Sequence, residues 1–207
     1  MEYEGLDLKT NDNVYEPAED SFLAAEVVSD EIDKLGGQLG VLDMGCGCGI
    51  VGLLAGAKEN VRSVTFADTS QEAVELARTN ADRNRDIVHA DCDFVKSDLF
   101  SSIDGRFDII IFNAPYLAEG KGDKMSNAWY GGEHGVEVAT AFLKQAVEHM
   151  NDHAEIVLIV SSLGDMQRLE EQMAPLGLAI DREQKTHVNF EDIVALVISK
   201  HYIMDIS

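Results

Sequence analysis

Short apolar runs alternate along the chain with segments in which apolar residues recur every three or four positions. The first pattern is typical of buried strands, and the second is typical of amphipathic helices. The predicted strands cover 40–45, 62–68, 87–91, 107–113 and 154–161, and the predicted helices cover 20–34, 50–57, 71–83, 136–151 and 164–175. Such alternation predicts an α/β fold with a mainly parallel sheet.

Two extended runs, 178–187 and 191–202, follow the last predicted helix and are separated by a short turn. They predict a hairpin that makes the far edge of the sheet antiparallel. Asp20 is a candidate N-cap of the first helix, and Ser70 is a candidate N-cap of the helix at 71–83. The polar, glycine-rich stretch 117–135 is long for a connection, so we expect it to be functional or mobile.

The net charge of −22, from 38 acidic and 16 basic residues, changes the choice of function class. A nucleic-acid binder needs a basic face to neutralise phosphates, so we expect no direct binding of nucleic acid. Proteins that work in molar salt also carry acidic surfaces, so adaptation to a high-salt cytosol is a second explanation of the charge. No apolar run reaches the ~18 residues of a membrane helix, and the acidic N-terminus lacks a secretory pattern. We therefore expect a cytoplasmic protein without membrane contact.

The cysteines and histidines give little support for a metal site. Cys46 and Cys48 flank a glycine and Cys92 is distant, which is too few ligands for zinc and an odd number for a disulfide framework. His149 and His153 stand four residues apart with no obvious third ligand. We expect no metal site.

Three glycines, Gly45, Gly47 and Gly49, alternate with other residues between a predicted strand and a predicted helix. Glycine permits close backbone approach, and a helix N-terminus offers free N–H groups to an anion. A dinucleotide would place its pyrophosphate there, but Asp43, two residues before the first glycine, suits an ammonium instead. S-adenosylmethionine carries both an ammonium and a carboxylate, so we expect it as the cofactor. The alternative is a purely structural turn.

Two further acids follow the next predicted strands. Asp68 lies nineteen residues after Gly49, close to the ~20 expected for an acid that binds ribose hydroxyls. Asp98 could accept a hydrogen bond from the adenine amine while Leu99 lies against the ring. The alternative is structural: Asp68 would cap the helix that follows it, and Asp98 would cap its own loop. For Asp68 the capping role and ribose binding are compatible.

The sequence Asn113-Ala114-Pro115-Tyr116 closes the apolar strand at 107–113. The Asn113 side-chain oxygen and the neighbouring carbonyl of Ala114 form a fork of two acceptors for the N–H groups of a planar NH2, and an aromatic ring can cover the flat face of that group. We expect Asn113, Ala114, Pro115 and Tyr116 to form the catalytic loop, with Asn113 also near the cofactor.

With these motifs the chain resembles class I S-adenosylmethionine-dependent methyltransferases. Within them it resembles the HemK-type protein-glutamine N5-methyltransferases of the short archaeal and eukaryotic branch. The catalytic loop is similar to their Asn-Pro-Pro-Tyr motif except at Ala114. Two further segments are similar to that branch: Val14-Tyr15-Glu16-Pro17-Ala18-Glu19-Asp20-Ser21-Phe22 and Trp129-Tyr130-Gly131-Gly132-Glu133-His134-Gly135.

The resemblance implies a Rossmann-like fold with a mostly parallel seven-stranded sheet. The chain is expected to be one methyltransferase domain over 1–207, in which 1–35 are an N-terminal cofactor-covering extension and first helix. Tyr15, Pro17 and Asp20 are expected to lie over the cofactor. The implied substrate is the glutamine of the Gly-Gly-Gln loop of a class 1 translation release factor.

The resemblance also implies a partner, a small zinc-binding activator protein that forms a heterodimer with the chain. In the sheet order usual for the family, the strand predicted at 87–91 lies at an edge, where a partner could add its own strand. We expect a charged residue in place of Val88 to break such a complex.

Three other functions remain open from the sequence. An acceptor fork also serves nucleic-acid methyltransferases that act on adenine or guanine amines. Another protein side chain, such as lysine, could be the acceptor. A non-catalytic cofactor-binding subunit is the third, although such a subunit has no need of Asn113 and Tyr116.

Overall fold

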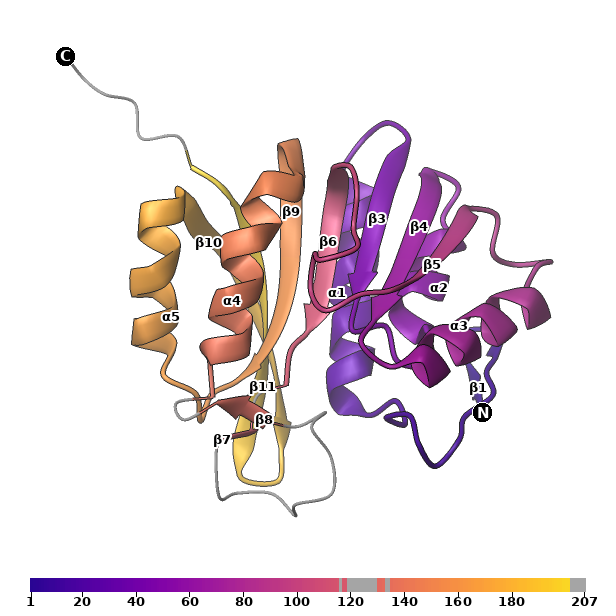
Figure 1. Cartoon of the computed structure of the whole chain (residues 1–207), viewed down its shortest axis with the longest axis horizontal. Coiled ribbons are helices and arrows are strands. Elements are labelled where there is room, and N and C mark those ends of the chain that lie inside the picture. Colours follow the sequence, from indigo (N-terminus) through magenta and orange to yellow (C-terminus); the bar gives the residue numbers. More distant parts are fainter. Residues whose placement is uncertain (116, 119–129, 133–134, 202–207) are drawn as a thin grey trace.

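The computed structural model describes residues 1–115, 117–118, 130–132 and 135–201. Its centre is a seven-stranded sheet (Figure 1). Across the sheet the order is β10 (Leu178–Val188), β11 (Glu191–Lys200), β9 (Met150–Ser161), β6 (Phe107–Asn113), β3 (Leu39–Met44), β4 (Val61–Asp68) and β5 (Asp91–Lys96). The strands from β9 to β5 are parallel, whereas β11 pairs antiparallel with both β9 and β10. The predicted parallel sheet with a C-terminal antiparallel hairpin is confirmed.

Helices cover both faces of the sheet, and each face has its own core. The helices α1 (Glu19–Lys34), α2 (Ile50–Gly56) and α3 (Gln71–Arg83) pack in one core, and α4 (Glu137–Ala146) and α5 (Met166–Met173) pack in the other. Alternate residues of β6 enter opposite cores, Ile109 and Ile111 one, Ile110 and Phe112 the other. Burial on both faces explains why this strand is a continuous apolar run rather than an alternating one.

The carboxyl ends of the central strands lie together at one edge of the sheet. Met44 at the end of β3 is in register with Phe112, one residue before the end of β6. The chain between β3 and β6 crosses over, so a crevice opens outside the ends of these neighbouring strands, where ligands of open α/β sheets bind.

The predicted position of the edge strand was wrong. The strand is at Asp91–Lys96, and residues 87–90 form the turn that precedes it. The N–H groups of Ile87 and Val88 donate to the Asn84 carbonyl at 2.9 Å, and Val88 packs against the core. The apolar signal of this segment therefore comes from a partly buried turn whose side chains pack against the core. A charge at Val88 would disturb that packing, so the substitution is not a clean test of a partner.

Other element boundaries differ by a few residues. The first helix is capped by Ala18, so Asp20 lies inside its first turn and is not its N-cap. Ser70 does cap α3, by accepting a hydrogen bond from the Ala73 N–H at 3.3 Å. The helix predicted at 136–151 ends as a 3-10 turn, η2 (Val147–His149), and β9 begins at Met150. A second 3-10 turn, η3 (Ala174–Leu176), follows α5.

Four short strands were not predicted. β1 (Glu2–Tyr3) and β2 (Leu6–Asp7) pair near the N-terminus, and β7 (Leu117–Ala118) and β8 (Tyr130–Gly132) pair in parallel after the predicted catalytic loop. Residues 119–129 and 133–134 of the loop predicted at 117–135 lie outside the described residues. None of the helices in the described part of the chain is long and apolar enough to cross a membrane.

Candidate active site

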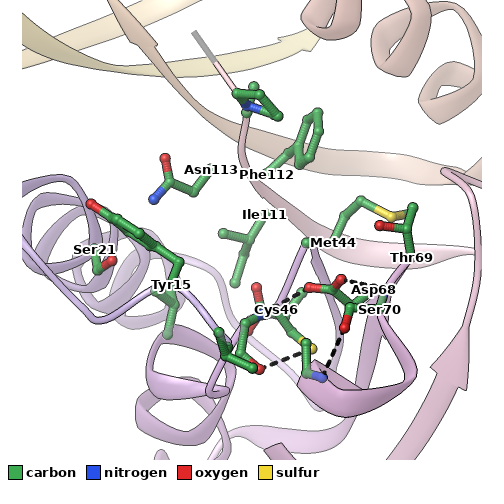
Figure 2. Close-up of a pocket in the computed structure, with 18 of the residues that line it drawn as sticks. Tyr15, Ser21, Met44, Cys46, Asp68, Thr69, Ser70, Ile111, Phe112 and Asn113 are labelled. Carbon is green, nitrogen blue, oxygen red and sulfur yellow. Dashed lines mark hydrogen bonds between the residues drawn. The ribbon is translucent and has the colours of Figure 1, made fainter. Parts of the chain in front are cut away.

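A cavity of about 730 Å³ lies at the carboxyl edge of the sheet (Figure 2). Its walls come from the N-terminal segment, the glycine loop, the ends of β3, β4 and β6, the turn after β5, and the first turns of α4. Segments far apart in the sequence meet there. The predicted residues that line it are Tyr15, Pro17, Asp20, Asp43, Gly45, Gly47, Asp68, Asp98, Leu99, Asn113, Ala114 and Pro115.

The three glycines of the loop have different roles. All three have positive φ, with values of 66° at Gly45, 53° at Gly47 and 87° at Gly49. Side chains rarely adopt this conformation, which explains the choice of glycine. Gly45 and Gly47 line the cavity, whereas Gly49 does not. A Cβ on Gly49 would lie 3.0 Å from the Cβ of Ala77, so this glycine lets the start of α2 pack closely on α3.

Asp43 is buried at the end of β3, with 4% of its surface exposed. Its Oδ2 accepts a hydrogen bond from the Gly52 N–H at 2.9 Å. Burial raises the pKa of this carboxyl to about 7, and Asp68 adds to the rise, whereas the Gly52 bond lowers it. A Cβ on Gly52 would lie 2.8 Å from that oxygen and 2.4 Å from the Phe66 ring. Gly52 is thus a part of the site that sequence reasoning missed.

Asp68 ties the glycine loop to the start of α3. Its two oxygens accept hydrogen bonds from the N–H groups of Gly47 at 3.1 Å and Ser70 at 2.8 Å. Figure 2 shows Asp68 and Ser70 together at one side of the cavity. The local capping role expected as an alternative is present, and the carboxylate lines the cavity as well.

The turn after β5 carries Asp98 and Leu99 into the cavity wall. Leu99 has a φ of 46°, which is rare for a bulky side chain. The hydroxyl of buried Ser97 holds the turn, since it donates to the Leu99 carbonyl at 2.6 Å and accepts from the Ser102 N–H at 3.0 Å. Ser97 also lines the cavity and was not predicted.

The N-terminal segment forms the opposite wall. The Tyr15 hydroxyl donates to the carboxylate of Asp20, 3.0 Å from both oxygens, and the Ser21 N–H donates to the same group at 2.6 Å. Burial and the neighbouring Asp20 raise the pKa of Tyr15 far above its ordinary value of 10. Tyr15 therefore stays a neutral donor, and its ring remains beside the cavity.

Asn113 is the last residue of β6 and points into the cavity (Figure 2). Its Oδ1 is buried, and no donor of the described residues bonds it. A buried acceptor without a partner costs free energy unless a ligand supplies the donor. Ala114, which is 2% exposed, and Pro115 follow in the wall. Tyr116, Trp129, Glu133 and His134 lie outside the described residues.

The helix α4 and the cysteines of the glycine loop contribute further side chains to the walls of the cavity. Glu137, Val138 and Ala141 of α4 also line the cavity and were not predicted, because nothing in their local pattern marks them. The cysteines Cys46 and Cys48 are buried in the loop wall, and burial raises the pKa of both thiols. The described residues contain no group of three His, Cys, Asp or Glu side chains placed to hold a metal ion.

Comparisons with known proteins agree with this architecture. The family model of the methyltransferase small domain matches residues 22–185. A Methanocaldococcus jannaschii protein named "Putative protein N5-glutamine methyltransferase" is 31% identical over 200 residues, covering 95% of this chain and 96% of the relative. A release factor glutamine methyltransferase of Lactococcus lactis is 33% identical over 76% of this chain, which spans 59% of that longer protein.

A solved structure shows the same fold. The E. cuniculi Mtq2 structure, solved as an Mtq2-Trm112 complex, has a TM-score of 0.67 at 21% identity and covers 91% of this chain and 99% of its own. The fold, the family model and the nearly full-length match agree. The chain belongs to the methyltransferase small domain family, and within it to the protein N5-glutamine methyltransferases.

Proposed function

We propose that this chain transfers a methyl group from S-adenosylmethionine to the side-chain nitrogen of the glutamine in the Gly-Gly-Gln loop of a class 1 translation release factor. The buried Oδ1 of Asn113, which no donor of the described residues bonds, carries the proposal, because the N–H group of a glutamine amide in the cavity would supply that donor. The names of the relatives, protein N5-glutamine and release factor glutamine methyltransferases, support glutamine as the acceptor.

The residues of the cavity fit the cofactor. The bare backbone of Gly45 and Gly47 leaves room beside the chain, and buried Asp43 is an acceptor suited to an ammonium. Asp68 would accept from ribose hydroxyls, and Asp98 with Leu99 would hold the adenine. When bound, S-adenosylmethionine supplies an electrophilic methyl group on a sulfonium.

A calorimetric titration tests the choice of cofactor. S-adenosylmethionine should bind and NAD should not. Asp68→Ala should weaken binding by roughly 1.5–3 kcal/mol, the range for charge-assisted hydrogen bonds. Asp68→Asn is the matched control, since an amide oxygen can still accept from Gly47 or Ser70 while losing the charge. Binding of NAD alone would remove the whole interpretation.

The catalytic loop acts on the acceptor amide by geometry. An amide nitrogen is a poor nucleophile because its lone pair is delocalised into its carbonyl. In the proposed complex, Asn113 Oδ1 and the Ala114 carbonyl accept the two N–H bonds and orient the nitrogen for in-line attack. Such placement is worth up to ~7–11 kcal/mol in favourable cases, and fixed acceptors add electrostatic stabilisation as the nitrogen becomes positive.

The methyl transfer does not need a general base to remove a proton from the amide nitrogen beforehand. The nitrogen becomes cationic as its bond to carbon forms, so it loses its proton readily afterwards. The buried setting of Asn113 and Ala114 excludes water from the two acceptors, which strengthens both hydrogen bonds. Tyr116 is proposed to cover the amide face, as the motif implies.

The experiment that tests the function is a radiolabelled methyl-transfer assay on cell extract, followed by mass spectrometry of the labelled product. We expect N5-methylglutamine within a Gly-Gly-Gln sequence. Label on lysine, or on adenine or guanine of nucleic acid, would replace this substrate with one of the other candidates. Absence of any label in the presence of the activator would refute the enzymatic function.

We also propose a heterodimer with a small zinc-binding activator protein. Among the strands that the structure describes, β5 is an edge strand that pairs only with β4, which leaves one side of its backbone for a partner strand. Three of its side chains, Cys92, Phe94 and Val95, are half-buried and apolar enough to extend a shared interface. An E. cuniculi protein with this fold was solved as a complex with Trm112, which makes such a partner a natural candidate.

Hydrogen exchange tests this partner without any substitution. When the chain is mixed with the activator, amides of Asp91–Lys96 should become protected, and light scattering should give a 1:1 complex. Amides of β10, the opposite edge strand, are the internal control and should not change. A complex that leaves β5 unprotected would move the interface elsewhere.

A further inference from the structure

The tip of the β10–β11 hairpin carries an exposed aromatic side chain. Phe190 is 96% exposed, in a turn where Asn189 adopts a φ of 56°. Among the described residues, the exposed large hydrophobic side chains are Phe190, Leu163 at 49% and Met1 at 41%. Leu163 follows the end of β9, the strand beside β11. Two of these three side chains therefore belong to one corner of the molecule.

Hydrogen bonds hold this corner in a defined shape. The Ser162 N–H donates to the Asp192 carbonyl at 2.8 Å, and the Asp192 N–H donates to the Ser162 hydroxyl at 2.9 Å. The Ser161 hydroxyl also donates to the carboxylate of Glu191. Phe190 and Leu163 each lie one or two residues from these bonds. An exposed aromatic on a pre-ordered turn loses little entropy on binding, as a contact residue requires.

The corner lies on the same edge of the sheet as the active site. Asn113 is in register with Ile159, and Ile159 is in register with Ala195. These two steps span ~10 Å across the sheet, and the five residues from Ala195 to Phe190 extend ~17 Å further along the strand. Figure 1 shows the hairpin tip at the end of the molecule where β3 and β6 terminate. Phe190 is thus ~20 Å from the acceptor fork.

Charge around this edge indicates what can bind there. Glu191, Asp192 and exposed Asp165 lie in the corner, where His187 Nδ1 contacts Asp192 Oδ1 at 2.8 Å, and exposed Glu16 and Glu19 belong to the N-terminal segment, whose neighbouring residues line the cavity. Such a rim repels nucleic acid and attracts a protein with a basic surface. The occupant therefore has to combine a basic face, an apolar recess for an aromatic ring, and a loop that reaches the cavity.

We propose that Phe190, supported by Leu163, is a docking contact for the folded protein that carries the methylated glutamine, and that the substrate is recognised at two points, the amide in the cavity and a second surface at the hairpin tip. The proposal rests on the proposed function, because it takes the occupant to be the substrate of the same site. A peptide of five residues spans at most ~17 Å, so it can fill the cavity without touching Phe190.

The test compares two substrates and four proteins. The substrates are the folded class 1 release factor of the same organism and a five-residue peptide with the Gly-Gly-Gln sequence. The proteins, each assayed with the activator, are the wild type, Phe190→Ser, the conservative Phe190→Leu, and the control Lys185→Ser, which alters an exposed side chain of the same hairpin. Binding of the release factor in the presence of S-adenosylhomocysteine is measured beside turnover.

For the release factor, Phe190→Ser should raise KM and the dissociation constant about tenfold, the effect of losing one aromatic contact, while kcat stays within about twofold. Phe190→Leu should recover most of the affinity, and Lys185→Ser should resemble the wild type. Turnover of the peptide should be the same in all four proteins.

Two results would overturn the docking role. One is an equal dissociation constant for the release factor with wild type and Phe190→Ser. The other is a wild-type dimer in sedimentation that Phe190→Ser dissociates, because the tip would then bind a second copy. If neither substrate is methylated, the proposed function fails, and the binding measurement still decides the docking contact.

Discussion

The side chain of Asn80 makes two hydrogen bonds with the main chain of Lys9, from which it is separated by 71 residues in the sequence. The Lys9 N–H donates to Asn80 Oδ1 at 2.8 Å, and Asn80 Nδ2 donates to the Lys9 carbonyl at 3.0 Å and to the Cys48 carbonyl at 2.9 Å. One fully buried amide thus joins α3, the glycine loop and the N-terminal segment. That segment continues directly into the cavity wall at Tyr15.

Asn80→Ala should therefore weaken both folding and cofactor binding. It leaves buried main-chain groups without partners, at a cost of about 1–3 kcal/mol for each group that water does not reach. The melting temperature should fall, and S-adenosylhomocysteine should bind several-fold more weakly because Tyr15 and Asp20 lose their support. Asn84→Ala is the matched control, since Asn84 pairs in the same way with Asp7, farther along the chain from Tyr15. Equal losses of cofactor affinity in both variants would contradict this role of Asn80.

Asn113→Ala should separate cofactor binding from catalysis. We expect cofactor affinity within a few-fold of the wild type and a fall in kcat of about 10²–10³, as for the loss of one preorganised hydrogen bond in a transition state. Ala114→Pro is the companion variant, and it should be tolerated because it restores the commoner ring without removing the carbonyl. Near-normal turnover of Asn113→Ala would refute the acceptor fork.

Sequence patterns located residues that line the cavity because these positions end strands that are buried on both faces. The run Ile109–Phe112 is apolar for that reason, so Asn113 stands out as the first polar residue after it. The glycine loop was equally visible, since its positive φ angles admit few other residues. The hairpin and most helices follow from the same alternation, whereas the strand order was expected from the family resemblance.

The remaining features depend on contacts that are distant in sequence. Asn80 resembles any polar residue of a helix until Lys9 and Cys48 are placed beside it. Gly52 appears dispensable until Asp43 and Phe66 fill the space of its Cβ. The edge strand was misplaced because polar, exposed Asp91 and Asp93 look less like a strand than the apolar, partly buried turn before it. The local pattern marks apolar side chains that pack against the core, and here some of these side chains belong to a turn.

The buried carboxyl of Asp43 predicts a pH dependence of cofactor binding. Its pKa is raised to about 7, so it becomes negatively charged as the pH rises through that value. The negative form attracts the ammonium of S-adenosylhomocysteine, so affinity should increase from pH 6 to pH 8, with release of a proton on binding. Asp43→Asn keeps an acceptor for Gly52 but cannot ionise, and it should flatten this dependence. Calorimetry in two buffers of different ionisation enthalpy measures the proton directly.

The charge of −22 predicts a dependence of stability on salt. Mutual repulsion of the carboxylates opposes folding at low ionic strength, and the screening length falls from ~10 Å at 0.1 M to ~3 Å at 1 M salt. The melting temperature should rise steadily from low to molar KCl. A flat or falling curve would contradict an adaptation to molar salt and indicate an ordinary acidic protein.

The last prediction concerns Glu155 of β9, which lies against Glu31 of α1. Glu31 is 3% exposed and pairs with Lys34 at 2.9 Å and with Arg182. Burial, followed by repulsion from Glu31, raises the pKa of Glu155 to about 7. The folded protein therefore holds a proton that the unfolded chain releases near its ordinary pKa of 4.5.

The sign of the effect follows from this order of pKa values. The contribution of Glu155 to stability is fully present below about pH 4.5 and is lost as the pH rises to about 7. Glu155→Gln keeps the size of the side chain and cannot ionise, so its melting temperature should match the wild type at pH 4.5 and exceed it at pH 8. Removing any negative charge from this acidic chain could also raise stability, so exposed Glu148→Gln serves as the control. An equal gain in both variants would attribute the effect to net charge and not to the carboxyl pair between α1 and β9.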